Sequence, residues 1–106
     1  MDNVDSAVKR LIEAVMETDI YKEYCRQLER VKQEPGLKEQ IDEFRSRNYI
    51  LQTRQEYDLN RIEAFEREYE DFRENPLVSD FLAAELAFCR MMQEMYLRIT
   101  EEIHFE

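Results

Sequence analysis

The sequence contains almost none of the residues that interrupt a helix. Its 106 residues include one glycine, two prolines and no tryptophan. Strands need tight turns between them, and this chain has too little glycine and proline to supply many. Hydrophobic residues still make up 43% of the chain and recur throughout it, which argues against disorder. We therefore expect a single all-α domain over residues 1–106.

Cysteines and long apolar runs are also scarce. Cys25 and Cys89 lie far apart, and neither belongs to a CxxC or Cys/His cluster, which disfavours a zinc site. Met1 precedes acidic residues rather than a basic region and an apolar core, so we expect no signal peptide and a cytoplasmic location. Within residues 81–99, the most apolar stretch, no apolar run exceeds four residues, which disfavours a membrane span.

The residue patterns of common enzyme sites are missing as well. The chain has one histidine, His104, so the paired Glu-x-x-His motifs of di-iron bundles are absent. Its only glycine is Gly36, which excludes a glycine-rich phosphate loop. We therefore expect no enzyme activity, no catalytic residue, no cofactor and no bound metal.

Apolar spacing and capping residues predict about four helices, at residues 3–17, 19–34, 37–74 and 76–103. The first carries one apolar stripe that we expect to be buried. Thr18 or Asp19 is a suitable cap for the second helix, which Pro35-Gly36 ends. Asn75 followed by Pro76 marks the start of the fourth.

The predicted helix at 37–74 is unusually long and has a polar middle. Its heptad ladder is apolar at both ends, whereas Asn48, Gln55 and Asp58 occupy ladder positions between them. Polar residues at such positions fix helix register and partner number, so Asn48 and Gln55 indicate a self-associating helix that forms a dimer. The alternative is a kink or a split into two helices between Arg54 and Asn60.

The fourth predicted helix has a wide apolar face. Its charged residues fall on the opposite side of a helical wheel. This face is either the core of a helical bundle or part core and part partner surface. The candidate interface residues, taken with the polar positions above, are Phe81, Phe88, Met92, Met95, Tyr96, Asn48 and Gln55.

Glu85 is the exception inside that apolar face, and we treat it as a candidate buried polar residue. A carboxylate there must be paired, hydrogen-bonded or near an edge. We expect an ion pair with an arginine of another helix. The alternatives are simple exposure, or a ligand-binding role beside Cys89.

Three arginines, Arg45, Arg47 and Arg54, lie in a segment of residues 45–55 that has no acid. Such a basic stripe is a candidate contact for RNA phosphates. The net charge of −10 opposes nucleic-acid binding at long range, so direct binding is disfavoured. We expect these arginines to pair with acids within a bundle or across a dimer.

Several segments together resemble a known family. Tyr21-Lys-Glu-Tyr24 opens one helix, Glu34-Pro-Gly-Leu-Lys38 precedes Ile41 to Phe44, and Asn75 to Glu85 reads NPLVSDFLAAE. In this order they resemble the YlbF/YmcA family of small bacterial helical proteins, over nearly the whole chain. The resemblance implies an all-α, self-associating protein of the Gram-positive bacterial cytoplasm without catalytic activity.

The same resemblance implies a regulatory adaptor tied to competence, sporulation and biofilm formation. It further implies assembly with other regulatory proteins and with RNA-processing machinery around an endoribonuclease. Some members are associated with iron–sulfur clusters held by cysteines, and here a cluster would need cysteines from several chains.

Our leading hypothesis is a non-enzymatic, homodimeric helical adaptor. One alternative is a small-ligand or iron–sulfur carrier that uses Glu85 and Cys89. Another is a coiled-coil, holdase-like structural protein that binds unfolded clients.

Overall fold

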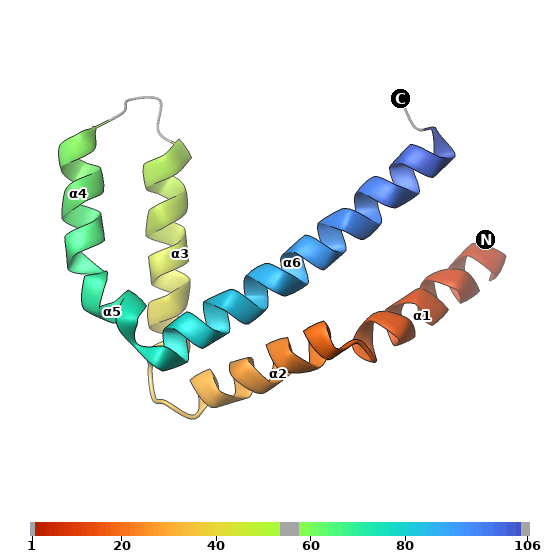
Figure 1. Ribbon diagram of the computed structural model, residues 1–106, viewed down its shortest axis with the longest axis horizontal. Coiled ribbons are helices and arrows are strands. Elements are labelled where there is room, and N and C mark those ends of the chain that lie inside the picture. The colour runs from red at the N-terminus through yellow and green to blue at the C-terminus, as the bar shows by residue number, and fades with distance from the viewer. Residues whose placement is uncertain (1, 54–57, 105–106) are drawn as a thin grey trace.

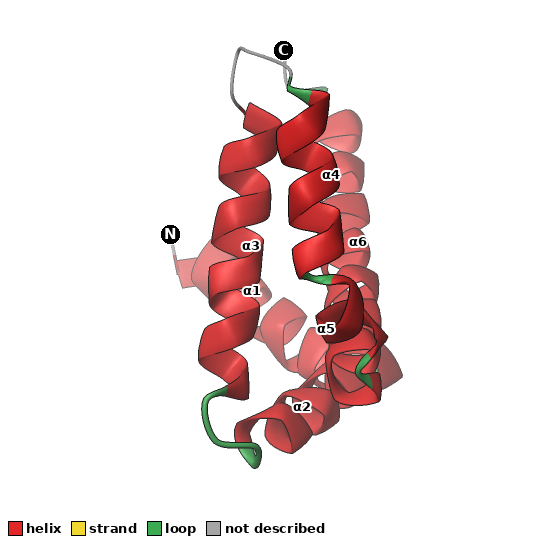
Figure 2. Ribbon diagram, turned by 90° about the vertical axis from the view of Figure 1, so that its left-hand side faces the viewer, coloured by secondary structure: helices red, strands yellow, loops and turns green. Residues whose placement is uncertain are grey.

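The computed structural model describes residues 2–53 and 58–104, and all of the regular structure in these ranges is helical (Figures 1 and 2). The helices are α1 (Asp2–Met16), α2 (Asp19–Lys32), α3 (Leu37–Thr53), α4 (Leu59–Glu68), α5 (Glu70–Glu74) and α6 (Pro76–Ile103). The all-α prediction is confirmed for this part of the chain.

The prediction of one long helix at 37–74 is wrong, because the segment forms α3, α4 and α5. Asp58 has an extended backbone, and its side chain accepts hydrogen bonds from the amides of Asn60 and Arg61 at 3.0 and 3.4 Å. It thereby caps a new helix, α4, which lies side by side with α3 (Figures 1 and 2). A straight helix would leave the apolar ends of the ladder uncovered, whereas the hairpin packs them together. The alternative of a split between residues 54 and 60 agrees with the start of α4 at Leu59.

The other predicted helix boundaries agree with the structure to within two residues. The hydroxyl of Thr18 accepts the Tyr21 amide at 3.1 Å and caps α2. The Asn75 side chain accepts the Leu77 amide at 3.0 Å and caps α6. Gly36 has a φ of 78°, a conformation that side-chain-bearing residues rarely adopt, in the turn before α3.

The hydrophobic core lies where α2, α3 and the first half of α6 meet. It consists of Val31, Leu37, Ile41, Val78 and Phe81, with α2 packed along α6. A second cluster, of aromatic rings, joins α3 to α4 and α5. In it the Phe44 ring lies 5.6 Å from Phe65, 5.0 Å from Tyr69 and 5.7 Å from Phe72.

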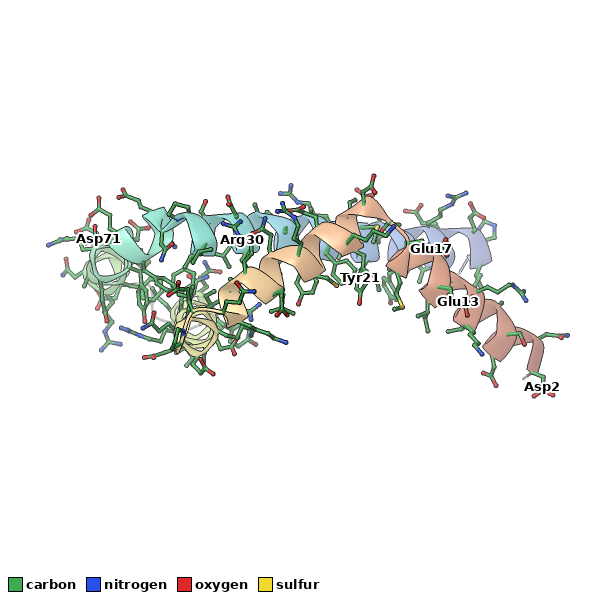
Figure 3. All side chains as sticks on the ribbon, turned by 90° about the horizontal axis from the view of Figure 1, so that it is seen from below. Asp2, Glu13, Glu17, Tyr21, Arg30 and Asp71 are labelled. Carbon is green, nitrogen blue, oxygen red and sulfur yellow. The ribbon has the colours of Figure 1, made fainter. Side chains whose placement is uncertain are left out.

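The fold is too open to cover its own apolar faces. Its radius of gyration is 17.9 Å, whereas a compact chain of this length has a radius near 13 Å. The accessible surface is 8739 Å², against about 6,300 Å² for a compact monomer of this mass. The excess of about 2,400 Å² arises because α1 and the end of α6 diverge at one end while the α3–α4 hairpin projects at the other (Figures 1 and 3).

Candidate interaction surfaces

The apolar side of α1 has no cover within the chain. No residue of this helix is buried, although its apolar residues follow helical spacing. We define the α1 face as Val4, Val8, Leu11, Ile12 and Met16, whose exposed fractions run from 41% to 54%. The prediction that this stripe is buried is therefore wrong, because the chain changes direction at Thr18 and α1 diverges from α6 (Figures 1 and 3).

α6 changes from a core helix to an uncovered helix along its length. Val78, Phe81 and Ala84 are buried in its first half. From residue 89 onward no residue of α6 is buried, and a shallow depression there is lined by Met92, Gln93, Tyr96 and Leu97. We define the distal α6 face as Met92, Tyr96, Leu97, Ile99 and Ile103, all exposed.

The predicted interface residues divide between core and surface. Phe81 is fully buried, so its surface is taken up within the chain. Phe88 is half-buried, with its ring 5.6 Å from Tyr21 and 5.3 Å from Tyr24. Met95 is also half-buried, whereas Met92 and Tyr96 belong to the distal α6 face.

Of the two polar ladder residues predicted at the interface, Asn48 and Gln55, the structure describes only Asn48. Asn48 is half-buried, and its side-chain oxygen accepts a hydrogen bond from Gln52 Nε2 at 3.3 Å, so its described contact is made within α3. Gln55 lies outside the described residues. The α1 face was predicted as buried core rather than as a surface, because an apolar stripe on one side of a helix is typical of both.

Glu85 pairs with Arg45, which is the type of partner expected from its place in the apolar arc. Its side chain is 19% exposed and accepts a hydrogen bond from Arg45 Nη1, which joins α3 to α6. Arg45 Nη2 also donates to Asp42 at 2.7 Å. Burial opposes the charged form of Arg45, but the hydrogen bonds to Asp42 and Glu85 outweigh it and raise the pKa. Hydrogen bonds from Lys38 and Arg45 lower the pKa of Asp42.

Arg47 is held in the same way on the other side of α3. Its guanidinium donates to both carboxylate oxygens of Glu68, at 2.7 and 2.9 Å, and to the Tyr69 hydroxyl at 2.9 Å. It also lies over the rings of Phe65 and Tyr69, 5.6 and 5.1 Å from their centroids. These hydrogen bonds raise the pKa of Arg47, and the pKa of Glu68 is lowered.

Two members of the candidate basic stripe are therefore engaged within the chain. Arg45 and Arg47 pair with carboxylates of α3, α4 and α6, and Arg54 lies outside the described residues. This arrangement favours ion pairing over phosphate contact as the role of these two arginines.

The α3–α4 hairpin carries a third exposed apolar area, at the other end of the molecule from the α1 face (Figure 1). Its most exposed members are Tyr49, Ile50 and Leu59, between 50% and 69% exposed. A groove beside Ile50 runs between the two helices. It is lined by Arg47, Ile50, Leu51, Arg61, Ala64, Phe65 and Glu68.

The described residues place no three His, Cys, Asp or Glu side chains where they could share a metal ion. Cys25 is half-buried on α2, and Cys89 is exposed on α6. None of the helices within 2–53 and 58–104 is long and apolar enough to cross a membrane. The features that remain to be explained are therefore the exposed apolar surfaces.

Comparison with known proteins gives one family match. The family model described as "Control of competence regulator ComK, YlbF/YmcA" matches residues 4–104. No curated protein and no solved structure matches the chain.

Proposed function

Since the chain belongs to the YlbF/YmcA family, which is described by its control of the competence regulator ComK, we propose that it is a non-enzymatic regulatory adaptor. It acts by holding other regulatory proteins together in a bacterial cytoplasm. The family model covers both ends of the described fold, so the proposal concerns the whole chain rather than one segment.

The observation that supports this proposal is the uncovered apolar surface. A chain of this mass that served alone as a carrier or a catalyst would gain stability by folding compactly around its site. This chain instead leaves about 2,400 Å² more surface exposed than a compact monomer. Part of this exposed surface is apolar, on the α1 face, the distal α6 face and the hairpin, and exposed apolar patches are typical of protein–protein contact sites.

Self-association is part of the proposal. An obligate dimer buries about 1,000–2,500 Å² on each partner, and the excess surface falls in that range. A homodimer would use one exposed area and keep another for the proteins that it regulates. An adaptor needs two such surfaces, and the α1 and distal α6 faces lie at the opposite end of the molecule from the hairpin tip (Figure 1).

We assign the hairpin tip, defined as Tyr49, Ile50 and Leu59, to contact with a partner protein of the RNA-processing machinery. Arg45 and Arg47 are engaged by carboxylates, so the apolar residues Tyr49, Ile50 and Leu59 remain the available contacts. Residues 58–74 of the same hairpin carry seven acids and three arginines, and this net negative charge disfavours contact with phosphate backbones.

The test is co-purification of the tagged chain from its native host, with and without nuclease, followed by mass spectrometry. We expect a small set of partners that survives nuclease, includes proteins that control the competence regulator, and is lost in Ile50→Glu. Gln52→Glu adds the same charge to an exposed polar position of the same helix and should retain the set.

Two results would contradict the proposal. Partners that disappear with nuclease would make RNA, rather than protein, the contacted molecule. The second result uses cells in which deletion of this chain's gene changes the activity of the competence regulator. If the tagged chain is recovered from such cells without any partner, direct protein contact is not the mechanism.

A further inference from the structure

The two uncovered faces at the end of the molecule are matched in length. α1 has 15 residues, and residues 89–103 of α6 have the same number, so each face extends about 22 Å. Both consist of apolar residues on one side of a helix. No residue of α1 or of residues 89–103 is buried, so the described part of the chain leaves both apolar sides incompletely covered.

The break between α1 and α2 keeps the two faces apart. The Thr18 hydroxyl donates to the Val15 carbonyl at 2.6 Å and accepts the Tyr21 amide at 3.1 Å. These bonds end one helix and start the next with a change of direction, which carries α1 away from the axis of α6 (Figures 1 and 3). The α1 face therefore needs a cover from outside its own chain.

The charge distribution favours a second copy of this chain as that cover. Two copies of a chain with a net charge of −10 repel one another. This repulsion is weakest between surfaces that carry little net charge. α1 carries three acids and two bases, a net −1, and residues 89–103 carry the same numbers. Residues 58–74 carry seven acids and three arginines, a net −4, so the hairpin end opposes self-association.

The surface area agrees with a second copy as well. Part of the excess of about 2,400 Å² arises at this end of each chain, and each partner of an obligate dimer buries about 1,000–2,500 Å². A two-fold axis brings the same patch of both copies together. Here that patch already contains two different helices, so two copies would supply four helices around one core.

We propose that α1 of each copy covers the distal α6 face of the other copy, so that the homodimer is built by exchange of its N-terminal helices. The inference rests on the self-association in the proposed function and specifies the surface that carries it. It places Val8 and Leu11 of one chain against Met92, Tyr96 and Ile99 of the other. The hairpin tips then stay free at the two outer ends.

The test is disulfide cross-linking between two differently tagged chains, in full-length protein carrying Cys25→Ser and Cys89→Ser. One chain carries Val8→Cys and the other Met92→Cys. We expect the mixed product to form at least about tenfold faster than with Arg10→Cys, because exchange brings only the apolar side of α1 to α6. Arg10 lies on the opposite side of the same helix from the α1 face, which makes it a matched control.

Sedimentation of the unmodified chain and two charge variants gives a second test. We expect the native chain to sediment at twice its 13.0 kDa mass, and Leu11→Glu to weaken dimerisation at least about 100-fold, because a carboxylate would enter the apolar interface. Ser6→Glu adds the same charge on the polar side and should remain dimeric. Circular dichroism should show unchanged helix content, since no residue of α1 is buried in its own chain.

The outcomes separate the inference from the proposed function. A native chain that is monomeric at micromolar concentration would overturn both the homodimer and the exchange. A dimer that persists in Leu11→Glu, or that gives no link between positions 8 and 92, would overturn the exchange and leave the homodimer. A link that forms only within one chain carrying both cysteines would show that α1 folds back onto its own α6, which also overturns the exchange.

Discussion

Removing the carboxylate of Glu85 tests whether the ion pair with Arg45 holds α3 against α6. The pair is partly buried, with side chains 19% and 39% exposed. Breaking a fully buried pair costs about 3–5 kcal/mol, whereas an exposed pair contributes about 0.2–1 kcal/mol. With one partner close to buried and the other more than a third exposed, we expect Glu85→Ala to lower the free energy of unfolding by about 1.5 kcal/mol.

A double-mutant cycle is needed because Arg45 has two carboxylate partners. Arg45→Ala also removes the hydrogen bond to Asp42, so the single variants do not measure the same interaction. We expect Glu85 and Arg45 to show a coupling energy of about 1 kcal/mol in urea unfolding at fixed protein concentration. The coupling should weaken in high salt, because the exposed side of the pair is screened.

The matched control is Glu94→Ala, which removes one carboxylate from the exposed side of the same helix. It should change the free energy of unfolding by less than about 0.5 kcal/mol. A coupling energy indistinguishable from zero, or an equal loss in Glu94→Ala, would refute the reasoning. Glu85 would then act as an ordinary surface residue, and the packing of α3 on α6 would depend on apolar contacts alone.

Phe81→Ala should lower the free energy of unfolding by about 3–5 kcal/mol in urea, because the ring is fully buried in the core and its removal leaves a cavity; a loss below 1 kcal/mol would contradict that placement. Asp42 and Glu68 have lowered pKa values in the folded chain, so their ionised forms stabilise it. This contribution to the free energy of unfolding is fully present above the ordinary carboxyl pKa and is lost as the pH falls through the lowered pKa values. Arg47→Ala should make that loss shallower in acid titrations followed by circular dichroism, and an unchanged slope would show that the Glu68 pair contributes nothing.

The helix boundaries were readable from the sequence because their causes are local. A cap acts on amides two or three residues away, and Thr18 and Asn75 lie directly before the helices that they start. Asp58 has the same chemistry and caps α4, but it lay inside a heptad ladder that also fits one continuous helix. Local pattern supported both readings there, and the packing of Phe44 on Phe65 decided between them.

The roles of individual site residues were less accessible. The position of Glu85 in an apolar arc required a partner, yet nothing in the spacing identified Arg45, which is 40 positions away in the sequence. Phe81 and Tyr96 belong to the same arc of the same helix, but one is fully buried and the other 65% exposed. The difference depends on where α2 begins alongside α6, since its first turns reach only as far as Phe88, and this is a long-range property.

The sequence by itself therefore determined the all-α class, most helix ends and the apolar side of each helix. The tertiary structure alone decided that the segment at 37–74 folds back as a hairpin, which arginine meets Glu85, and that the α1 and distal α6 faces are left uncovered. The physical reason is that periodicity within a helix identifies the side that avoids water. It carries no information about the surface that covers that side, since this depends on the directions of helices distant in the chain.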